Sequence, residues 1–358
     1  MAPPAVVPAT AAGYHRRMTR TLRTKLTTVT AALLALTAAL TLAACGESLS
    51  GATSVDGSGA GAGEAGAAGA ITAGDEGAGA PQAASVFTDL PYDGTSPAQT
   101  LDLYLPSTGE APHPVIVALH GGGFAIGDKT GRPTDSALAG LRRGYAVAAV
   151  GYRLSGEATF PAAVSDVKAA VRWLRAHAGE YGLDPERIAA WGHSAGGNLA
   201  AMAGTSGGIA ALDGPDPANA GESDRVQAVV DWYGPISFLR TDEDFRASGI
   251  GETDHSALDS TLSRYLGAPL AAVPAKVRAA DPITYITADD PPFLIQHGTG
   301  DGTVPMQQST RLAAALEQTL GSDMVTLELL PGARHVDPAF FTPANVEKVL
   351  DWLDAQLR

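Results

Sequence analysis

Cysteine and positive charge are both scarce in this chain. Its 358 residues include one cysteine, Cys45, so no disulfide can form within the chain. Lys and Arg number 24 against 38 Asp and Glu, which gives a formal net charge of −14. Proteins that bind nucleic acids neutralise phosphates with clustered Lys and Arg. We therefore expect no nucleic-acid partner.

The patterns that hold metals and nucleotides are also missing from the chemistry-bearing stretches. None of the eight histidines is spaced as H-x-x-x-H or H-E-x-x-H, the spacings typical of zinc sites on helices. The glycine run at 121–123 is not part of a G-x-G-x-x-G pattern, and no P-loop lysine follows it. The sequence therefore predicts no metal ion and no cofactor.

The N-terminal segment has the layout of an export signal. Five basic residues between positions 16 and 25 precede an apolar run at 26–42, which is short for a transmembrane helix. The run ends in Leu-Ala-Ala-Cys, which resembles the bacterial lipobox. We expect residues 1–45 to be a lipoprotein signal, with Cys45 lipidated and the mature protein anchored on the outer face of the cell membrane. A simple signal peptide and a secreted soluble protein are the alternative, and either Met1 or Met18 can be the start.

The rest of the chain divides into a linker and one domain. Residues 46–85 are Gly, Ala and Ser with scattered acids, a composition typical of a disordered tether. In residues 86–358, short apolar runs alternate with amphipathic stretches, which predicts an α/β fold with a mostly parallel sheet covered by helices on both faces. The predicted strands are 101–105, 115–120, 146–150, 188–192, 226–232, 293–296 and 325–329, and the predicted helices are 162–181, 198–204, 307–320 and 346–357. The polar segment 236–286 interrupts the alternation and is predicted to be a small cap over the site.

A candidate nucleophile lies between a predicted strand and a predicted helix. The residues Gly-His-Ser-Ala-Gly-Gly at 192–197 contain a G-x-S-x-G pattern centred on Ser194. In this frame the serine stands on a sharp turn with its hydroxyl exposed, and the glycines are needed because a side chain would collide with neighbouring backbone. Ser194 is therefore predicted to be a catalytic nucleophile.

A glycine-rich loop follows the strand predicted at 115–120. Its sequence, His-Gly-Gly-Gly-Phe at 120–124, lets backbone N–H groups approach a substrate closely. We expect the N–H groups of Gly122, Gly123 and Ala195 to form the oxyanion hole. His120 is expected to brace this loop.

A serine nucleophile needs a base and an acid that orients the base. His335 lies on the loop between the last predicted strand and the last helix, where the base of such hydrolases is found. Asp301 follows the strand at 293–296 and precedes His335 in the chain, as the orienting acid should. Asp281, Asp289, Asp290 and Asp337 are rival candidates for this acid. The predicted catalytic residues are Ser194, Asp301 and His335.

Taken together, these stretches resemble the α/β-hydrolase superfamily, in particular its esterase/lipase group. The resemblance runs through QTLDLYLP, HGGGFAIGDK, the 160–201 stretch, DWYGPISFL, DPITYI, PPFLIQHGTGDGTVP and GARHVDPAFF. The relatives it suggests are bifunctional feruloyl/acetyl-xylan esterases and, through HGGG, hormone-sensitive-lipase-like enzymes. The latter commonly carry Asp where this chain has His193, which favours the xylan-esterase-like branch.

The resemblance implies a serine carboxylesterase that hydrolyses short acyl esters through an acyl-enzyme. Its substrate would be a small-molecule ester or an acetyl or feruloyl group on plant polysaccharide. Two alternatives remain open at this stage: a prolyl-oligopeptidase-like serine peptidase, and a catalytically silent hydrolase fold that serves as a surface binding module.

Overall fold

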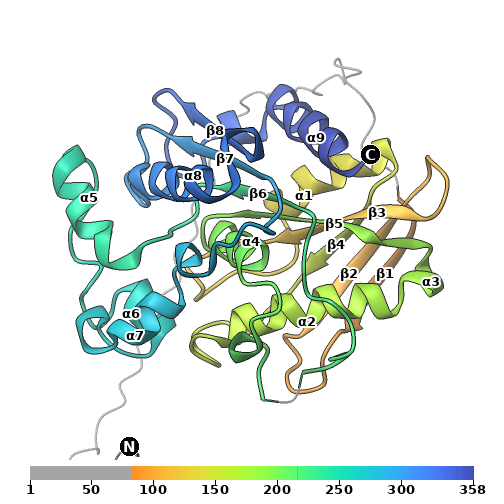
Figure 1. The fold of residues 1–358 in the computed structure, drawn as a ribbon, viewed down its shortest axis with the longest axis horizontal. Coiled ribbons are helices and arrows are strands. Elements are labelled where there is room, and N and C mark those ends of the chain that lie inside the picture. The colour runs from red at the N-terminus through yellow and green to blue at the C-terminus, as the bar shows by residue number, and fades with distance from the viewer. Residues whose placement is uncertain (1–82, 216) are drawn as a thin grey trace, which may run out of the picture. The chain divides into compact units, whose positions relative to one another are not determined.

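A single mixed sheet organises the domain. The computed structural model describes residues 83–215 and 217–358, and eight strands lie in the order β1-β2-β4-β3-β5-β6-β7-β8 (Figure 1). The pairs β1–β2 and β2–β4 are antiparallel, and every other neighbouring pair is parallel. The strands are β1 Ala83–Pro91, β2 Thr100–Pro106, β3 His113–Leu119, β4 Ala146–Val150, β5 Leu183–His193, β6 Ala228–Trp232, β7 Phe293–Gly298 and β8 Val325–Leu330.

Helices cover both faces of this sheet, as the continuously apolar strands require. Helices α2, α4 and α8 contribute to one buried cluster, and α1 and α9 contribute to the cluster on the other face (Figure 1). The helices are α1 Arg132–Leu138, α2 Ala162–Ala176, α3 Ala178–Tyr181, α4 Ala195–Thr205, α5 Thr241–Ser248, α6 Thr261–Leu266, α7 Pro274–Ala279, α8 Gln307–Leu320 and α9 Pro343–Leu357. This is the α/β-hydrolase architecture that the sequence predicts.

All seven predicted strands and all four predicted helices are present. The predicted helix 162–181 is two helices, because the chain leaves helical geometry at His177, between α2 and α3. The model also contains β1 and α1, which the sequence analysis did not include. β1 is an almost fully exposed edge strand, so it lacks the apolar pattern of the buried strands, and it begins within the segment assigned to the linker.

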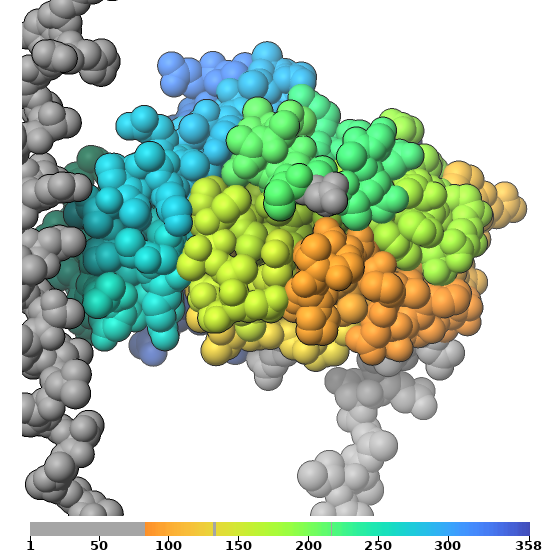
Figure 2. Space-filling view, turned by 90° about the horizontal axis from the view of Figure 1, so that it is seen from below, coloured from red at the N-terminus to blue at the C-terminus, as the bar shows by residue number. Residues whose placement is uncertain are grey.

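The predicted cap contains helices α5, α6 and α7 and packs against the sheet domain. Its buried side chains join the apolar cluster of α2, α4 and α8, among them Phe238, Leu262, Tyr265, Leu266, Leu270 and Val277. The ring of Tyr265 stacks on Phe124 with centroids 3.8 Å apart, and its carbonyl accepts a hydrogen bond from the N–H of Phe160 at 2.8 Å. On α8, Arg311 pairs with Asp244 of α5 at 2.7 Å. In Figure 2 the teal and cyan surface that includes the cap borders the yellow-green surface that includes α2. The cap therefore shares the core of the sheet domain.

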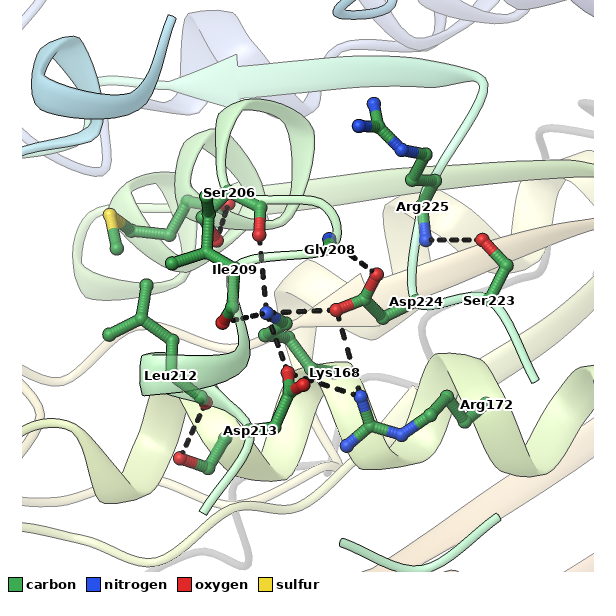
Figure 3. A network of polar contacts seen from close by, with 12 residues as sticks. Lys168, Arg172, Ser206, Gly208, Ile209, Leu212, Asp213, Ser223, Asp224 and Arg225 are labelled. Carbon is green, nitrogen blue, oxygen red and sulfur yellow. Dashed lines mark hydrogen bonds and ion pairs between the residues drawn. The ribbon is translucent and has the colours of Figure 1, made fainter. Parts of the chain in front are cut away.

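A buried ion network holds the long connection from α4 to β6. Lys168 of α2 is 1% exposed, and its Nζ lies 2.7 Å from Asp213 and 2.8 Å from Asp224. The same ammonium donates to the carbonyls of Ser206 and Ile209, and Arg172 adds a second cation to both carboxylates (Figure 3). Buried charges persist where they are paired and hydrogen-bonded, so this network holds the connection against α2.

Candidate active site

The turn that carries Ser194 joins the end of β5 to the start of α4. Ser194 has φ 54° and ψ −123°, a backbone conformation that non-glycine residues rarely adopt. A Cβ on Gly192 would lie 1.9 Å from the carbonyl oxygen of Gly196, and one on Gly196 would lie 2.2 Å from that of Leu119. The glycines at 192 and 196 are therefore required by close backbone approach, as predicted from the pattern.

Ser194, His335 and Asp301 are brought together from three segments far apart in the chain. The Oγ of Ser194 lies 2.9 Å from Nε2 of His335, and Nδ1 of His335 lies 2.7 Å from Oδ2 of Asp301. Because an ionised carboxylate only accepts hydrogen bonds, Nδ1 carries the proton in this pair. In the neutral ring Nε2 is then an acceptor for the serine hydroxyl, which is the tautomer that a general base needs.

The Asp301 carboxylate is buried, and both of its oxygens accept hydrogen bonds. Its Oδ1 accepts hydrogen bonds from the backbone N–H groups of Thr303 and Val304 at 2.8 and 2.9 Å. Burial alone would raise the pKa of Asp301, but the hydrogen bonds and charges of His297 and His335 outweigh it and hold the pKa well below its usual range. Asp301 is therefore an anion over the whole pH range in which the protein is expected to work.

The loop at 120–124 turns sharply beside Ser194. Gly122 has φ 115°, and a Cβ there would lie 2.0 Å from the carbonyl oxygen of Ile126, so only glycine fits. Gly122 and Gly123 line the same cavity as Ser194 and Ala195. Ala195 is the first residue of α4, so its N–H has no acceptor within the helix. The three predicted donors are thus gathered around one cavity.

Two histidines hold that loop from behind. The ring of His120 stacks on Tyr152 with centroids 4.2 Å apart, and its Nδ1 lies 2.8 Å from the carbonyl oxygen of Gly121. The Nε2 of His193 accepts a hydrogen bond from the N–H of Gly121 at 3.1 Å. Burial, followed by the charges of His120 and His335, lowers the pKa of His193 to about 3, so the ring stays a neutral acceptor.

His193 and His297 are positioning residues that the sequence analysis missed. His193 precedes Ser194 in the chain, and its ring fixes the oxyanion loop through the N–H of Gly121. His297 is buried, and its Nε2 lies 3.3 Å from Oδ2 of Asp301 while its Nδ1 lies 2.6 Å from the hydroxyl of Ser309. Its place at the end of β7, four residues before the predicted acid, was the signal available in the sequence.

The rival aspartates lie away from the base. Asp281 and Asp337 accept backbone N–H groups at the starts of short 3-10 turns, from Ile283 and Ala339 respectively. Asp289 and Asp290 bond to the hydroxyl of Thr287. Of the candidates named from the sequence, Asp301 is therefore the one that contacts His335.

The cavity above Ser194 has a volume of about 390 Å³. Its floor comes from the turn that carries Ser194 and from the glycine-rich loop at 120–124. Its walls come from the loops at 303–304 and 335–336 and from the cap. The cap contributes the side chains of Thr241, His255, Thr261 and Leu262. The segment predicted as a cap thus forms part of the cavity that contains the candidate nucleophile.

Comparison with known proteins identifies the family of the domain. Residues 101–316, more than half of the chain, match the family model described as BD-FAE. The chain belongs to the BD-FAE family. It is 36% identical over 258 residues to the probable carboxylic ester hydrolase LipM of Mycobacterium tuberculosis, an alignment that covers 69% of this chain and 55% of LipM. The chain thus spans little more than half the length of this relative.

Solved structures of esterases have a similar fold. A truncated carbohydrate esterase from gut microbiota superposes with a TM-score of 0.69 at 27% identity, covering 76% of this chain and 96% of that one. The esterase Est2 of Thermogutta terrifontis with bound butyrate superposes with a TM-score of 0.58 at 27% identity, covering 75% and 94%. These likenesses cover nearly the whole of both neighbours.

Aromatic side chains pack against His335, the predicted catalytic base. Trp232 and Tyr233 are buried and do not line the cavity. Tyr233 instead packs edge-on against His335, with ring centroids 4.9 Å apart, and against Phe340 at 4.5 Å. Their role in the domain is to support the loop that carries His335.

Backbone strain is concentrated around this BD-FAE site. Among the described residues, six that are not glycine have positive φ; Phe124, Ser194 and Val336 line the cavity, and Tyr233 packs against His335. Such conformations cost about 1–3 kcal/mol each and persist where the surrounding structure imposes them. The concentration marks the site independently of the G-x-S-x-G pattern.

Within the described ranges, no helix is long and apolar enough to cross a membrane, and no three His, Cys, Asp or Glu side chains are grouped to hold a metal ion. The predicted signal, the lipidation site Cys45 and nearly all of the predicted linker lie outside the described residues.

Proposed function

We propose that the protein is a serine carboxylesterase that hydrolyses short acyl esters through an acyl-enzyme intermediate. The observation that carries this proposal is the unbroken chain of contacts Ser194–His335–Asp301 at 2.9 and 2.7 Å, in a cavity that Gly122, Gly123 and Ala195 also line. The family and the names of the relatives, carboxylic ester hydrolase and carbohydrate esterase, support an ester as the substrate.

The geometry supports the following reaction sequence. His335 Nε2 takes the hydroxyl proton as Ser194 Oγ forms a bond to the ester carbonyl carbon, and the carbonyl oxygen becomes an oxyanion. The N–H groups of Gly122, Gly123 and Ala195 stabilise that charge, an effect worth about 10²–10³ in rate per donor. Asp301 stays ionised and stabilises the imidazolium. His335 then gives its proton to the departing alkoxide, and water repeats both steps to release the acid.

The two alternatives fit the molecule less well. The described chain contains the triad and the oxyanion loop, whereas a silent binding module would be expected to have lost one of them. A serine peptidase of the prolyl-oligopeptidase kind carries a large propeller beside its hydrolase domain, and the neighbours found here are esterases. Labelling by a fluorophosphonate that Ser194→Ala abolishes would contradict the silent module.

We further propose that the natural substrate is an acetyl or feruloyl ester of a polysaccharide, with the acetyl group as the smaller of the two. A cavity of about 390 Å³ lies at the small end of ligand sites, which typically span about 300–1,000 Å³. The solved neighbours include a carbohydrate esterase and an esterase with bound butyrate.

The test compares the full-length protein with Ser194→Ala on p-nitrophenyl esters from acetyl to long acyl chains, together with methyl ferulate and acetylated xylan. We expect turnover to be highest for the short chains and to vanish in the variant. Equal turnover by the variant, or none on any ester, would refute the esterase proposal. Turnover of aryl esters without release of acetate from xylan or of ferulate would refute the polysaccharide assignment alone.

We also propose that the protein is exported and anchored to the membrane by a lipid on Cys45. The support is the sequence pattern at 16–45. Expression in a bacterial host with Cys45→Ala should move the protein from the membrane fraction to the soluble fraction, and a variant that stays in the membrane would contradict the anchor.

A further inference from the structure

Two polar side chains of the cap reach the cavity without a role in acyl transfer. Thr241 is 3% exposed, and among the described residues its hydroxyl has no hydrogen-bond partner although the residue lines the cavity. Leaving a buried donor or acceptor unpaired costs about 1–3 kcal/mol, so such a group in a folded protein needs an explanation. The hydroxyl oxygen is shielded from solvent in this rotamer, and a rotation about χ1 into the cavity would let a ligand hydroxyl supply the missing partner.

His255 lines the same cavity and is fixed from behind. Its Nδ1 lies 2.8 Å from Oδ1 of Asp242, and its backbone N–H donates to the same oxygen at 3.0 Å. The ring stacks on Phe245 with centroids 5.2 Å apart. Because the Asp242 carboxylate accepts the Nδ1 proton, Nε2 of the neutral ring is an acceptor for a group in the cavity. A second oriented His–Asp pair therefore lines the cavity that also contains the candidate catalytic base.

The loop that carries His255 adjoins the loop of the orienting acid. A Cβ on Gly251, in the loop between α5 and α6, would lie 2.7 Å from the carbonyl oxygen of Gly302. Because the leaving alcohol takes its proton from the base that Asp301 orients, the alcohol belongs near the Asp301 loop and hence near the loop of His255.

We propose that His255, oriented by Asp242, and Thr241 form a leaving-group subsite that binds the hydroxyl groups of a polyhydroxylated alcohol, that is, a sugar. This inference rests on the esterase function proposed above. The Nε2 of His255 accepts a hydrogen bond from a sugar O–H, and the Thr241 hydroxyl donates to or accepts from a second one. An alcohol without these hydroxyls leaves both groups unpaired, which is how a site built for hydroxyls discriminates against such analogues.

The test uses three acetate esters with the full-length protein: an acetylated methyl xyloside, cyclohexyl acetate and p-nitrophenyl acetate. The first two differ in the ring hydroxyls, and the third reports on the catalytic machinery. The measured quantity is the ratio of kcat/KM for the xyloside to that for cyclohexyl acetate. Loss of one hydrogen bond in His255→Leu should lower this ratio about three- to tenfold, while turnover of p-nitrophenyl acetate persists.

The matched control is His177→Leu, which removes a histidine ring that stacks on Trp173 far along α2 and contacts no cavity residue. Its ratio should equal that of the wild type. Should His255→Leu fail to fold, the isosteric Thr241→Val provides the same ratio test.

The outcomes separate the two proposals. If p-nitrophenyl acetate is not hydrolysed by the wild type, the esterase function fails. If it is hydrolysed but the wild type does not favour the xyloside, or if His255→Leu and Thr241→Val leave the ratio unchanged, the subsite is refuted and the esterase stands. A preference for the xyloside that both cap variants lower supports the subsite.

Discussion

Replacing Lys168 by Met should destabilise the domain far more than replacing a surface lysine. The change keeps the length of the side chain but removes an ammonium that is 1% exposed and contacts two carboxylates and two carbonyls. Breaking one partner out of a buried ion pair typically costs about 3–5 kcal/mol. Arg172 stays 3.3 and 3.6 Å from Asp213 and Asp224, so we expect the lower end, about 3 kcal/mol.

Equilibrium unfolding in urea, followed by tryptophan fluorescence, measures this loss. The control is Lys348→Met, which removes an exposed pair with Glu328 at 3.2 Å and should cost about 0–1 kcal/mol. Burial would raise the pKa of Asp224, but Lys168 and the N–H of Gly208 hold it below its ordinary value of 3.8. That carboxylate therefore stabilises the fold above this pH and less below it, and the loss caused by Lys168→Met should shrink on acidification.

The reasoning about the network also predicts how two changes combine. Asp224→Asn together with Lys168→Met should cost less than the sum of the single losses, because the second change removes a charge that the first left unpaired. A loss below about 1 kcal/mol for Lys168→Met, or full additivity of the pair, would show that the network does not hold the connection from α4 to β6.

Three further predictions concern the site itself. Asp301→Asn should lower kcat for p-nitrophenyl acetate by about 10⁴ with little change in folding, because the amide no longer enforces the base tautomer; a loss under tenfold would contradict its role. Gly196→Ala should prevent the native turn, since its Cβ would lie 2.2 Å from the Leu119 carbonyl oxygen; native-like activity and stability would contradict this. Burial raises the pKa of Asp231 to about 6, so its contribution to stability falls as pH rises from 3.8 to about 6. Asp231→Asn should therefore gain up to about 3 kcal/mol relative to the wild type between acid and neutral pH, measured by urea unfolding; a constant difference would refute it.

The parts of the fold that were readable from the sequence share a physical cause. Strands buried on both faces must be continuously apolar, so β3, β4 and β7 stand out without any alignment. The turn that carries Ser194 could also be predicted from the sequence. Its glycines at 192 and 196 are required, because a Cβ on either would lie 1.9 or 2.2 Å from a backbone carbonyl oxygen. The exposed edge strand β1 needs neither a continuously apolar sequence nor particular glycines. Its residues therefore do not stand out from the preceding segment.

Site residues could be predicted from the sequence where their role depends on their position in the chain. They could not be predicted where their role depends on tertiary contacts. Ser194, Asp301 and His335 each follow a strand, as chain order requires. His193 and His297 act through a neighbour's backbone or carboxylate, and the spacing of residues does not reveal those contacts. The same holds for Trp232 and Tyr233, whose place in the aromatic packing below His335 follows from the sheet, not from their position next to a strand end.

This difference also explains why the chemistry is easier to derive than the substrate. The residues proposed to break the ester bond are fixed by the sheet and its adjoining turns, which the fold must keep for its own stability. The residues proposed to bind the alcohol lie on the cap, which packs into the apolar cluster on one face of the sheet and contacts the oxyanion loop through Tyr265 on Phe124 and α8 through Asp244 with Arg311. Because Phe124 belongs to the oxyanion loop and Thr241 lies three residues from Asp244, a change in the cap's packing shifts the alcohol subsite and the oxyanion loop together. Substitutions at the cap contacts should therefore alter the preference among alcohols and the rate of acyl transfer in parallel, whereas Thr241→Val alters only the first.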